Sequence, residues 1–224
     1  MLNNRPRLAF FDVDGVLVDS LPQHLSICAD QAREFGLPLH IPDIDEFRHM
    51  VARGVRVSPM AELYRSLGFP EALAPTLVAH YDAIFAEAYP TALFPGVPQL
   101  LDDLARSGFT LGIVTANSRQ NVGRMLGGSM AHFDERWCWY ADTIPEGAGK
   151  AWCLEQAAQR MTLDPAERVF VGDQPSDAAA ARKANWRFIG VTYGWGIPDG
   201  SHPFPVAHSV AEVAKTLTSS PAWQ

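Results

Sequence analysis

The sequence contains little cysteine and no long apolar run. Its three cysteines, Cys28, Cys138 and Cys153, are too few and too scattered for a disulfide framework, and none belongs to a Cys-x-x-Cys pair that would indicate zinc. The apolar run near the start, residues 8–11, is interrupted by Asp12, and no stretch approaches the ~18 apolar residues that span a bilayer. We therefore expect a soluble cytoplasmic protein without a signal peptide and without a membrane partner.

Positive charge is also scarce. The chain of 224 residues has 18 Lys and Arg against 25 Asp and Glu, a formal net charge of -7, and no basic run reverses this balance locally. Such a chain repels nucleic-acid backbones, so we expect no nucleic-acid partner. With 47% hydrophobic and 19% charged residues it should fold around a packed core. Nothing in the sequence indicates an oligomeric state.

Apolar strand-like runs alternate with helical patterns along most of the chain. Four short runs without polar alternation are typical of strands buried on both faces of a parallel sheet: 8–11, 110–114, 169–171 and 188–191. Helical patterns follow these runs or lie between them, at 99–107, 119–126, 151–161, 177–184 and 209–218. This alternation predicts an α/β fold with a doubly wound parallel sheet.

Residues 20–90 interrupt the alternation. Apolar residues between 25 and 35 have helical spacing, and further helices are expected at 44–51, 59–67 and 75–89, without a convincing strand. We therefore predict an all-helical cap domain at 20–90, inserted into an α/β core domain made of 1–19 and 91–224. The hinges should lie near 18–22 and 90–96.

Polar residues stand where three predicted strands end. Asp12 and Asp14 follow the first strand, Thr115 the second and Asp173 the third, while Lys150 begins a helix. Ligands bind beyond the carboxyl ends of strands in such sheets, so these side chains should share one crevice. A hard divalent cation such as Mg²⁺, held by Asp12 and Asp173, would offset the charge of a phosphate group, and attack by Asp12 would divide hydrolysis into two easier steps.

Three segments resemble motifs of the haloacid dehalogenase superfamily. The segment DVDGVLVDS at 12–20 is similar to its first motif, IVTANS at 113–118 to its second and GDQPSD at 172–177 to its fourth, with Lys150 as the third. The resemblance covers about residues 8–196. The helical insertion and the segments FPGV at 94–97 and GWG at 194–196 are similar to the branch that contains β-phosphoglucomutase and phosphoglycolate phosphatase.

The resemblance implies a role for each matching residue. Asp12 would be the nucleophile and a metal ligand, and Asp14 would be the acid/base and supply its backbone carbonyl to the Mg²⁺. Asp173 would be a metal ligand, and Asp177 a ligand or the neighbour of one. The implied substrate and phosphate contacts come from Thr115, the Ala116 N–H, Asn117, His24 and Lys150, which would bridge phosphate and nucleophile.

The sequence departs from the family pattern at two places. Ala151 follows Lys150 where proline is usual, after an atypical segment at 146–149, and Asn185-Trp186 replace the small residue and glycine usual after the fourth-motif helix. In the insertion, Arg53 and Arg56 lie in a segment that resembles the specificity loop of the same branch. Arginine suits a second carboxylate or phosphate on a substrate, and it also suits an exposed helical face.

We interpret the chain as a phosphatase that hydrolyses a small phosphorylated metabolite, of the phosphoglycolate or sugar-phosphate type, through an aspartyl-phosphate. A phosphomutase similar to β-phosphoglucomutase would use the same residues. A non-catalytic protein that binds a phosphorylated ligand is the alternative outside enzymes. Dehalogenases of the superfamily lack the second aspartate, so Asp14 argues against that chemistry.

Overall fold

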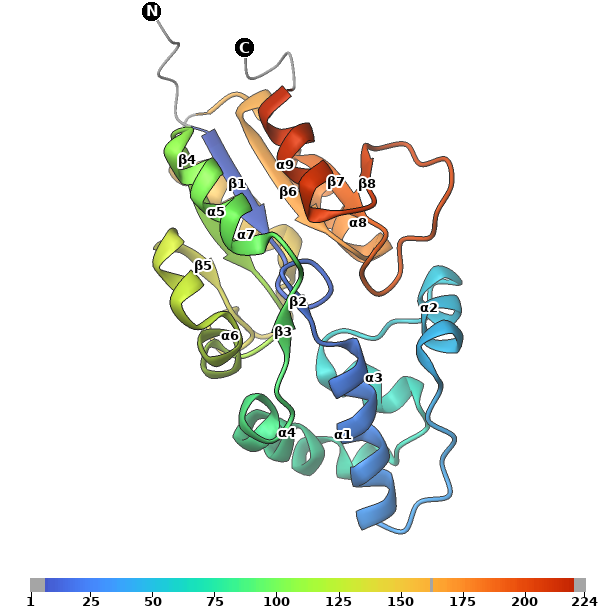
Figure 1. Ribbon diagram of the computed structural model, residues 1–224. Coiled ribbons are helices and arrows are strands. Elements are labelled where there is room, and N and C mark those ends of the chain that lie inside the picture. Colours follow the sequence, from blue (N-terminus) through green and yellow to red (C-terminus); the bar gives the residue numbers. More distant parts are fainter. Residues whose placement is uncertain (1–6, 162, 220–224) are drawn as a thin grey trace, which may run out of the picture.

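A six-stranded parallel sheet lies at the centre of the upper part of the molecule in Figure 1. The computed structural model describes residues 7–161 and 163–219. The strands run in the order β5-β4-β1-β6-β7-β8, and each neighbouring pair is parallel. They are β1 (Arg7–Phe11), β4 (Phe109–Val114), β5 (Phe133–Trp139), β6 (Arg168–Gly172), β7 (Arg187–Val191) and β8 (Val206–Ala207).

Helices cover both faces of this sheet, because both faces of its strands are apolar. Along β1, Ala9 and Phe11 face one side and belong to a cluster with α5 and α9, whereas Leu8 and Phe10 face the other side and pack with α7 and α8. All four side chains are completely buried. The helices are α5 (Val97–Arg106), α6 (Arg119–Leu126), α7 (Lys150–Arg160), α8 (Pro175–Lys183) and α9 (Val210–Ser219). The doubly wound α/β fold predicted from the sequence is confirmed.

Four further helices form the lower part of the molecule in Figure 1. They are α1 (Leu21–Glu34), α2 (Ile44–Ala52), α3 (Met60–Ser66) and α4 (Ala74–Ala88), with a short 3-10 helix at Glu71–Leu73. They pack around their own apolar cluster, which includes Phe47, Leu63 and Leu77. The chain enters and leaves this helical part through the antiparallel pair β2 (Val18–Asp19) and β3 (Ala92–Leu93). We keep the domain division at 19/20 and 90/91 as a proposal.

The predicted elements differ from the observed ones mainly at the edges of the sheet. β5 covers Phe133–Trp139, and its register with β4 shifts between Leu111 and Ile113. β8 was not predicted, because two residues carry no recognisable pattern. Short 3-10 helices at Gly127–His132 and Pro165–Glu167 complete the core. Trp186, at one departure from the family pattern, is buried 4.7 Å from the Phe10 ring.

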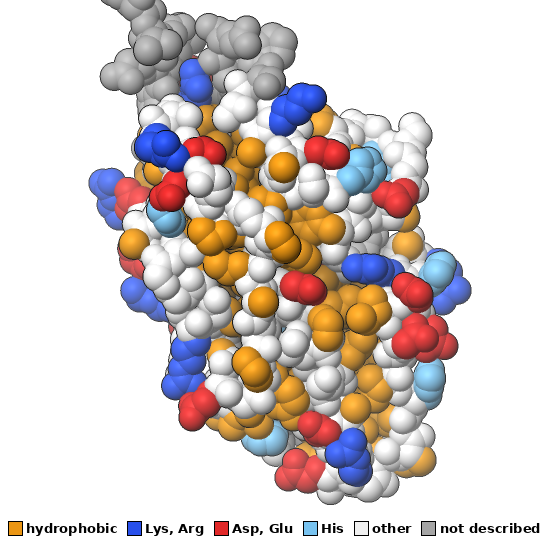
Figure 2. Space-filling view, in the orientation of Figure 1, with side chains coloured by type: hydrophobic (Ala, Val, Ile, Leu, Met, Phe, Trp, Pro, Cys, Tyr) orange, Lys and Arg blue, Asp and Glu red, His pale blue; other side chains and the backbone are white. Residues whose placement is uncertain are grey.

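Surface charge and helix hydrophobicity are relevant to the predicted absence of nucleic-acid and membrane partners. On the face drawn in Figure 2, acidic and basic side chains are interspersed, and no broad basic patch is visible among the described residues. None of the helices within 7–161 and 163–219 combines the length and the apolar character that crossing a membrane requires. The absence of a nucleic-acid partner stays a prediction.

Candidate active site

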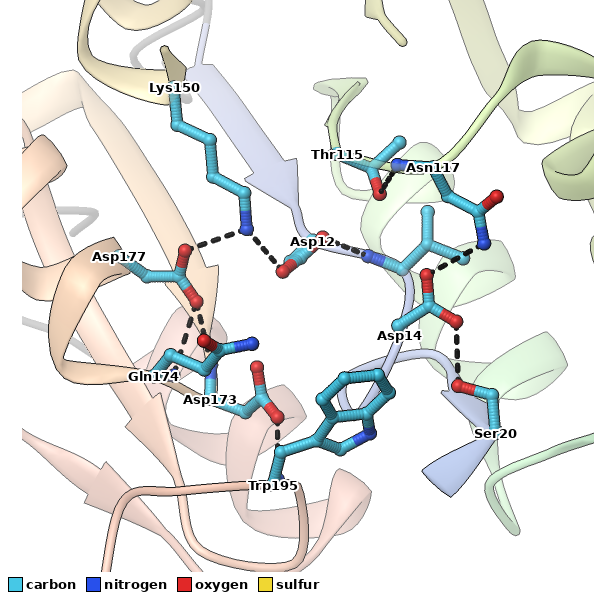
Figure 3. Close-up of polar contacts among 11 residues, drawn as sticks. Asp12, Asp14, Ser20, Thr115, Asn117, Lys150, Asp173, Gln174, Asp177 and Trp195 are labelled. Atoms are coloured by element: carbon cyan, nitrogen blue, oxygen red, sulfur yellow. Dashed lines mark hydrogen bonds and ion pairs between the residues drawn. The ribbon is translucent and has the colours of Figure 1, made fainter. Parts of the chain in front are cut away.

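The carboxyl ends of three neighbouring strands bring the predicted site together. Phe11, the last residue of β1, is in register with Ile113 of β4 and with Val171 of β6. Asp12, Thr115 and Asp173 follow these strands, and the Asp12 N–H still donates to the Val171 carbonyl at 3.0 Å. All three side chains are buried. The sheet therefore gathers polar groups at the edge where the sequence placed them (Figure 3).

Lys150 joins this group from the first turn of α7. Its Nζ donates to Asp12 Oδ2 and, at 2.7 Å, to Asp177 Oδ1 (Figure 3). Asp177 Oδ2 accepts the backbone N–H groups of Asp173 at 3.2 Å and Gln174 at 3.1 Å, and Asp177 forms a capping box with Gln174, the N-cap of α8. Asp177 therefore fixes both the lysine and the loop that carries Asp173. The unusual Ala151 does not keep Lys150 away from Asp12.

Burial dominates the electrostatics of the site. It raises the pKa of Asp12 to about 7, with Asp177 and Asp14 contributing in the same direction and Lys150 opposing. Burial also raises the pKa of Asp173 well above its ordinary value, and Asp177 and Asp12 add to the rise. Burial lowers the pKa of Lys150, but Asp12 and Asp177 outweigh it, so the net shift is upward. Lys150 alone therefore does not compensate the negative charge of the buried carboxylates of Asp12, Asp173 and Asp177.

The two carboxylate oxygens of Asp173 differ in their contacts. Its Oδ2 accepts the Trp195 N–H at 2.6 Å, whereas Oδ1 is buried with no hydrogen-bond partner among the described residues. One carboxylate oxygen each from Asp12, Asp173 and Asp177 lies within 4.8 Å of the others. Oxygen ligands with an excess of negative charge suit a hard divalent cation, so these side chains fit the predicted Mg²⁺.

A glycine allows the loop after β7 to approach Asp173. A Cβ at Gly194 would lie 2.4 Å from the Asp173 Cβ and 2.4 Å from the Gly15 carbonyl oxygen, so a side chain does not fit there. Arg48 of α2 donates to the Gly194 carbonyl at 3.0 Å, which attaches the same loop to the helical part. No contact was predicted for Trp195 or Arg48, and only the GWG segment at 194–196 indicated this loop.

Asp14 is held from two sides. The Ser20 hydroxyl donates to Oδ1 at 2.6 Å, and the Asn117 side-chain amide donates to Oδ2 at 2.9 Å. Asn117, for which a substrate or phosphate contact was predicted, lines the cavity, and its backbone N–H donates to Thr115 Oγ1 at 3.2 Å. Ser20 was not predicted as a site residue, although it ends the first motif.

His24 lies behind Asp14 and is neutral. Its Nδ1 is 2.8 Å from the Ser20 carbonyl oxygen, which can only accept, so Nδ1 carries the hydrogen. Nε2 lies 3.0 Å from the Tyr81 hydroxyl, and in a neutral ring with its hydrogen on Nδ1 it would accept the hydrogen of Tyr81. Burial lowers the pKa of His24, and Asp14, 4.0 Å away, opposes this shift. His24 thus contributes a neutral ring to the site.

A small cavity of about 40 Å³ lies between the strand ends and the helical part. The core contributes the polar floor, which includes Asp12, Asp14, Thr115, Ala116 and Asn117. The helical part contributes Val57, Ser58, Met60, Leu63, His24 and Tyr81.

The structure does not bring the two predicted cap arginines to this cavity. Arg53 and Arg56 are exposed and neither lines it. They lie in a turn that precedes the buried Val57, so the chain directs Val57 rather than an arginine toward the cavity.

Comparison with known proteins gives one family and one fold. The model of a family described as haloacid dehalogenase-like hydrolase matches residues 9–191. A phosphoglycolate phosphatase of Pseudomonas putida is 30% identical over 194 residues, which cover 85% of this chain and 71% of the relative. A phosphoglycolate phosphatase of Vibrio vulnificus is 31% identical over 232 residues, which cover 98% of this chain and all of the relative.

Solved structures share the same architecture. A hydrolase of the haloacid dehalogenase-like family from Streptococcus pneumoniae superimposes with a TM-score of 0.74 at 24% identity, over 95% of this chain and 98% of that one. CbbY from Rhodobacter sphaeroides, solved in complex with xylulose-(1,5)bisphosphate, superimposes with a TM-score of 0.68 at 20% identity, over 92% and 95% of the two chains.

Proposed function

The chain belongs to the haloacid dehalogenase-like hydrolase family, and we propose that it is a magnesium-dependent phosphatase that forms an aspartyl-phosphate on Asp12. The observation that carries the proposal is the pair of contacts around Asp12: Lys150 donates to its Oδ2, and Asp173 presents an unpartnered buried oxygen beside it. The substrate would be a small phosphate monoester, in keeping with the small size of the cavity beside Asp12.

Asp12 and Asp173 would hold Mg²⁺ together with the backbone carbonyl of Asp14. When bound, the cation would neutralise charge on the phosphoryl oxygens and on the carboxylates. Asp177, whose two oxygens already accept hydrogen bonds from Lys150 and from two backbone N–H groups, would mainly hold Lys150 and the Asp173 loop in place. Of the two roles that the resemblance implies for Asp177, the neighbour of a metal ligand therefore fits its contacts better than a direct ligand.

The proposed reaction has two steps. An Asp12 oxygen attacks phosphorus, the bond from phosphorus to the leaving alcohol oxygen breaks, and Asp14 donates a proton to that oxygen. A water then attacks the aspartyl-phosphate, Asp14 accepts its proton, and inorganic phosphate leaves a regenerated Asp12. Ser20 and Asn117 orient Asp14 for both transfers. Thr115, the Ala116 N–H and Lys150 would stabilise the phosphoryl oxygens.

The helical part would act as the cap of this site. Residues 20–90 supply one wall of the cavity, and the contact of Arg48 with the Gly194 carbonyl connects them to the loop that holds Asp173. Closure of this wall over a substrate would exclude water from the aspartyl-phosphate. We also propose a cytoplasmic location, in keeping with the free thiols of Cys28, Cys138 and Cys153.

Hydrolysis of p-nitrophenyl phosphate tests the proposal. We expect phosphate release with Mg²⁺, no release with chelator, and no release from the Asp12→Asn variant in either condition. Brief incubation with substrate followed by hydroxylamine should trap the acyl phosphate at Asp12 only in the wild-type chain. Phosphate transfer to a sugar phosphate without net release would favour the phosphomutase. Tight binding of phosphorylated ligands without turnover or trapping would favour the non-catalytic alternative.

A further inference from the structure

The wall that faces the phosphate site contains no side chain with a permanent positive charge. Among the described residues that line the cavity, none is Lys or Arg, and its one histidine, His24, is buried against the Ser20 carbonyl and the Tyr81 hydroxyl. Arg53 and Arg56 are exposed outside it. Lys183 of α8 borders a neighbouring groove and is also exposed. The cation next to the cavity, Lys150, is engaged by Asp12 and Asp177.

The wall is instead apolar where it meets a bound ester. Val57 and Leu63 are buried members of the cap cluster, and Met60 is partly buried against the same cluster. Asp12 and Asp14 lie opposite this wall. A second anionic group on the substrate would lose water against Val57, Met60 and Leu63, and no basic side chain in the lining would compensate.

The polar groups that remain in the wall match a hydroxyl. Ser58 and Tyr81 offer hydroxyl groups, and the Tyr81 hydroxyl lies 3.0 Å from His24 Nε2. The Trp195 Nε1 is buried without a hydrogen-bond partner among the described residues, so it can donate. An alcohol can form hydrogen bonds with such uncharged groups, whereas a carboxylate or phosphate would bring a charge that they do not neutralise.

We propose that this site selects phosphate monoesters whose leaving group is an uncharged, hydroxyl-bearing alcohol, and that it discriminates against carboxylated and doubly phosphorylated esters. This rests on the proposed phosphatase function and specifies its substrate class. It also separates this chain from what the names of its relatives would suggest, because phosphoglycolate carries a carboxylate on the carbon next to the ester.

A matched substrate pair tests the selection directly. 2-Hydroxyethyl phosphate and 2-phosphoglycolate differ only in a CH₂OH group against a carboxylate. We expect kcat/KM for the hydroxyethyl ester to be at least tenfold higher, and Kd for the Asp12→Asn variant with Mg²⁺, measured by calorimetry, to differ in the same direction. Equal values or a preference for phosphoglycolate would overturn the selection while leaving the phosphatase intact. If the wild type showed no Mg²⁺-dependent hydrolysis of p-nitrophenyl phosphate, the phosphatase proposal itself would be wrong.

Substitution of Met60 tests the wall itself. Met60→Lys places an ammonium on the partly buried face, and we expect it to shift the ratio of the two kcat/KM values at least tenfold toward phosphoglycolate. Met60→Gln is the matched control of similar length without charge, and its ratio should stay within about twofold of the wild type. A similar shift in both variants would show that packing rather than charge sets the preference, contrary to the proposal.

Three exposed basic residues test whether a positive charge outside the cavity contributes to the preference. Arg53→Ala, Arg56→Ala and Lys183→Ala should each keep the wild-type ratio, because none of these residues lines the cavity. A selective loss of phosphoglycolate hydrolysis in any of them would mean that a cation reaches the substrate, and the proposal would fail. Trp195→Phe should lower kcat/KM for 2-hydroxyethyl phosphate by about threefold to tenfold and leave ethyl phosphate unchanged, as loss of one neutral hydrogen bond predicts.

Discussion

Lys150 and Asp177 are joined by a hydrogen bond of 2.7 Å across 27 residues of sequence. The two residues stand at the beginnings of consecutive helices, α7 and α8. Because Asp177 also accepts two backbone N–H groups around Asp173, the ammonium is coupled to the loop that carries the free carboxylate oxygen. The charge of Lys150 therefore has a structural task in addition to the proposed catalytic one.

We expect Lys150→Met to destabilise the metal-free protein by about 3 kcal/mol at pH 8, because removal of one partner leaves buried carboxylates uncompensated. The loss should be smaller at pH 6, where Asp12 can take up a proton, and Mg²⁺ should restore part of it. Urea unfolding at both pH values measures the effect. Lys183→Ala, on the exposed end of α8, is the control. An equal effect of the two substitutions would contradict the coupling.

Asp12→Asn should reduce phosphate release by at least about 10⁴-fold, the order of loss seen when a covalent nucleophile is removed. The fold should persist, since the amide removes a carboxylate that burial already disfavours and Lys150 retains Asp177. Single-turnover kinetics and a thermal melt without metal measure the two effects. Turnover near the wild-type rate would eliminate Asp12 as the nucleophile.

Asp173→Asn should weaken Mg²⁺ binding by about 10- to 100-fold, because the unpartnered Oδ1 is proposed as a ligand. The Trp195 N–H can still donate to the amide oxygen, so the loop after β7 should keep its position. Calorimetric titration with Mg²⁺ gives the affinity. Asp45→Asn, an exposed carboxylate in the first turn of α2, should bind Mg²⁺ as tightly as the wild type. Unchanged affinity in Asp173→Asn would remove this residue from the metal site.

The pH dependence of Mg²⁺ binding follows from Asp12. Its pKa in the folded, metal-free chain is about 7, above the ordinary 3.8, so the folded state holds a proton that the unfolded chain releases. Stability of the metal-free protein should therefore fall as pH rises from 3.8 to about 7 and then level off. Mg²⁺ needs the ionised carboxylate, so its Kd should rise by about tenfold per pH unit below 7 and stay constant above. Titrations between pH 5.5 and 8.5 measure this, and a Kd independent of pH would contradict it.

The floor of the site could be predicted from the sequence because its main residues directly follow recognisable strands. Asp12, Thr115 and Asp173 follow apolar runs, and parallel pairing of β4, β1 and β6 brings such ends together. Lys150 was harder to place from its neighbours, since residues 146–149 do not fit the family pattern. It was nevertheless predicted as the third motif, and in the structure it contacts Asp12 and Asp177.

The walls of the site could not be predicted in the same way. The cavity positions of Val57 and Met60 depend on how a turn between α2 and α3 is folded, and local sequence does not fix the direction of such a turn. Arginines in that turn therefore seemed suited to a substrate, although they are exposed. Trp195 and Ser20 contact the site through single hydrogen bonds from loops, for which no periodic pattern exists.

The central position of β1 has a consequence for the order of events during synthesis. This strand is synthesised before its two neighbours, which are β4, about a hundred residues later, and β6, whose pairing reaches Arg168. Until β6 and the residues after it have been made, the apolar segment of β1 has no complete sheet to join and Asp12 has no Asp173 beside it. The active site can therefore form only late in synthesis, when Asp12 and Asp173 are both present. Nascent chains that lack β6 should depend on chaperones to keep the apolar β1 segment from aggregating.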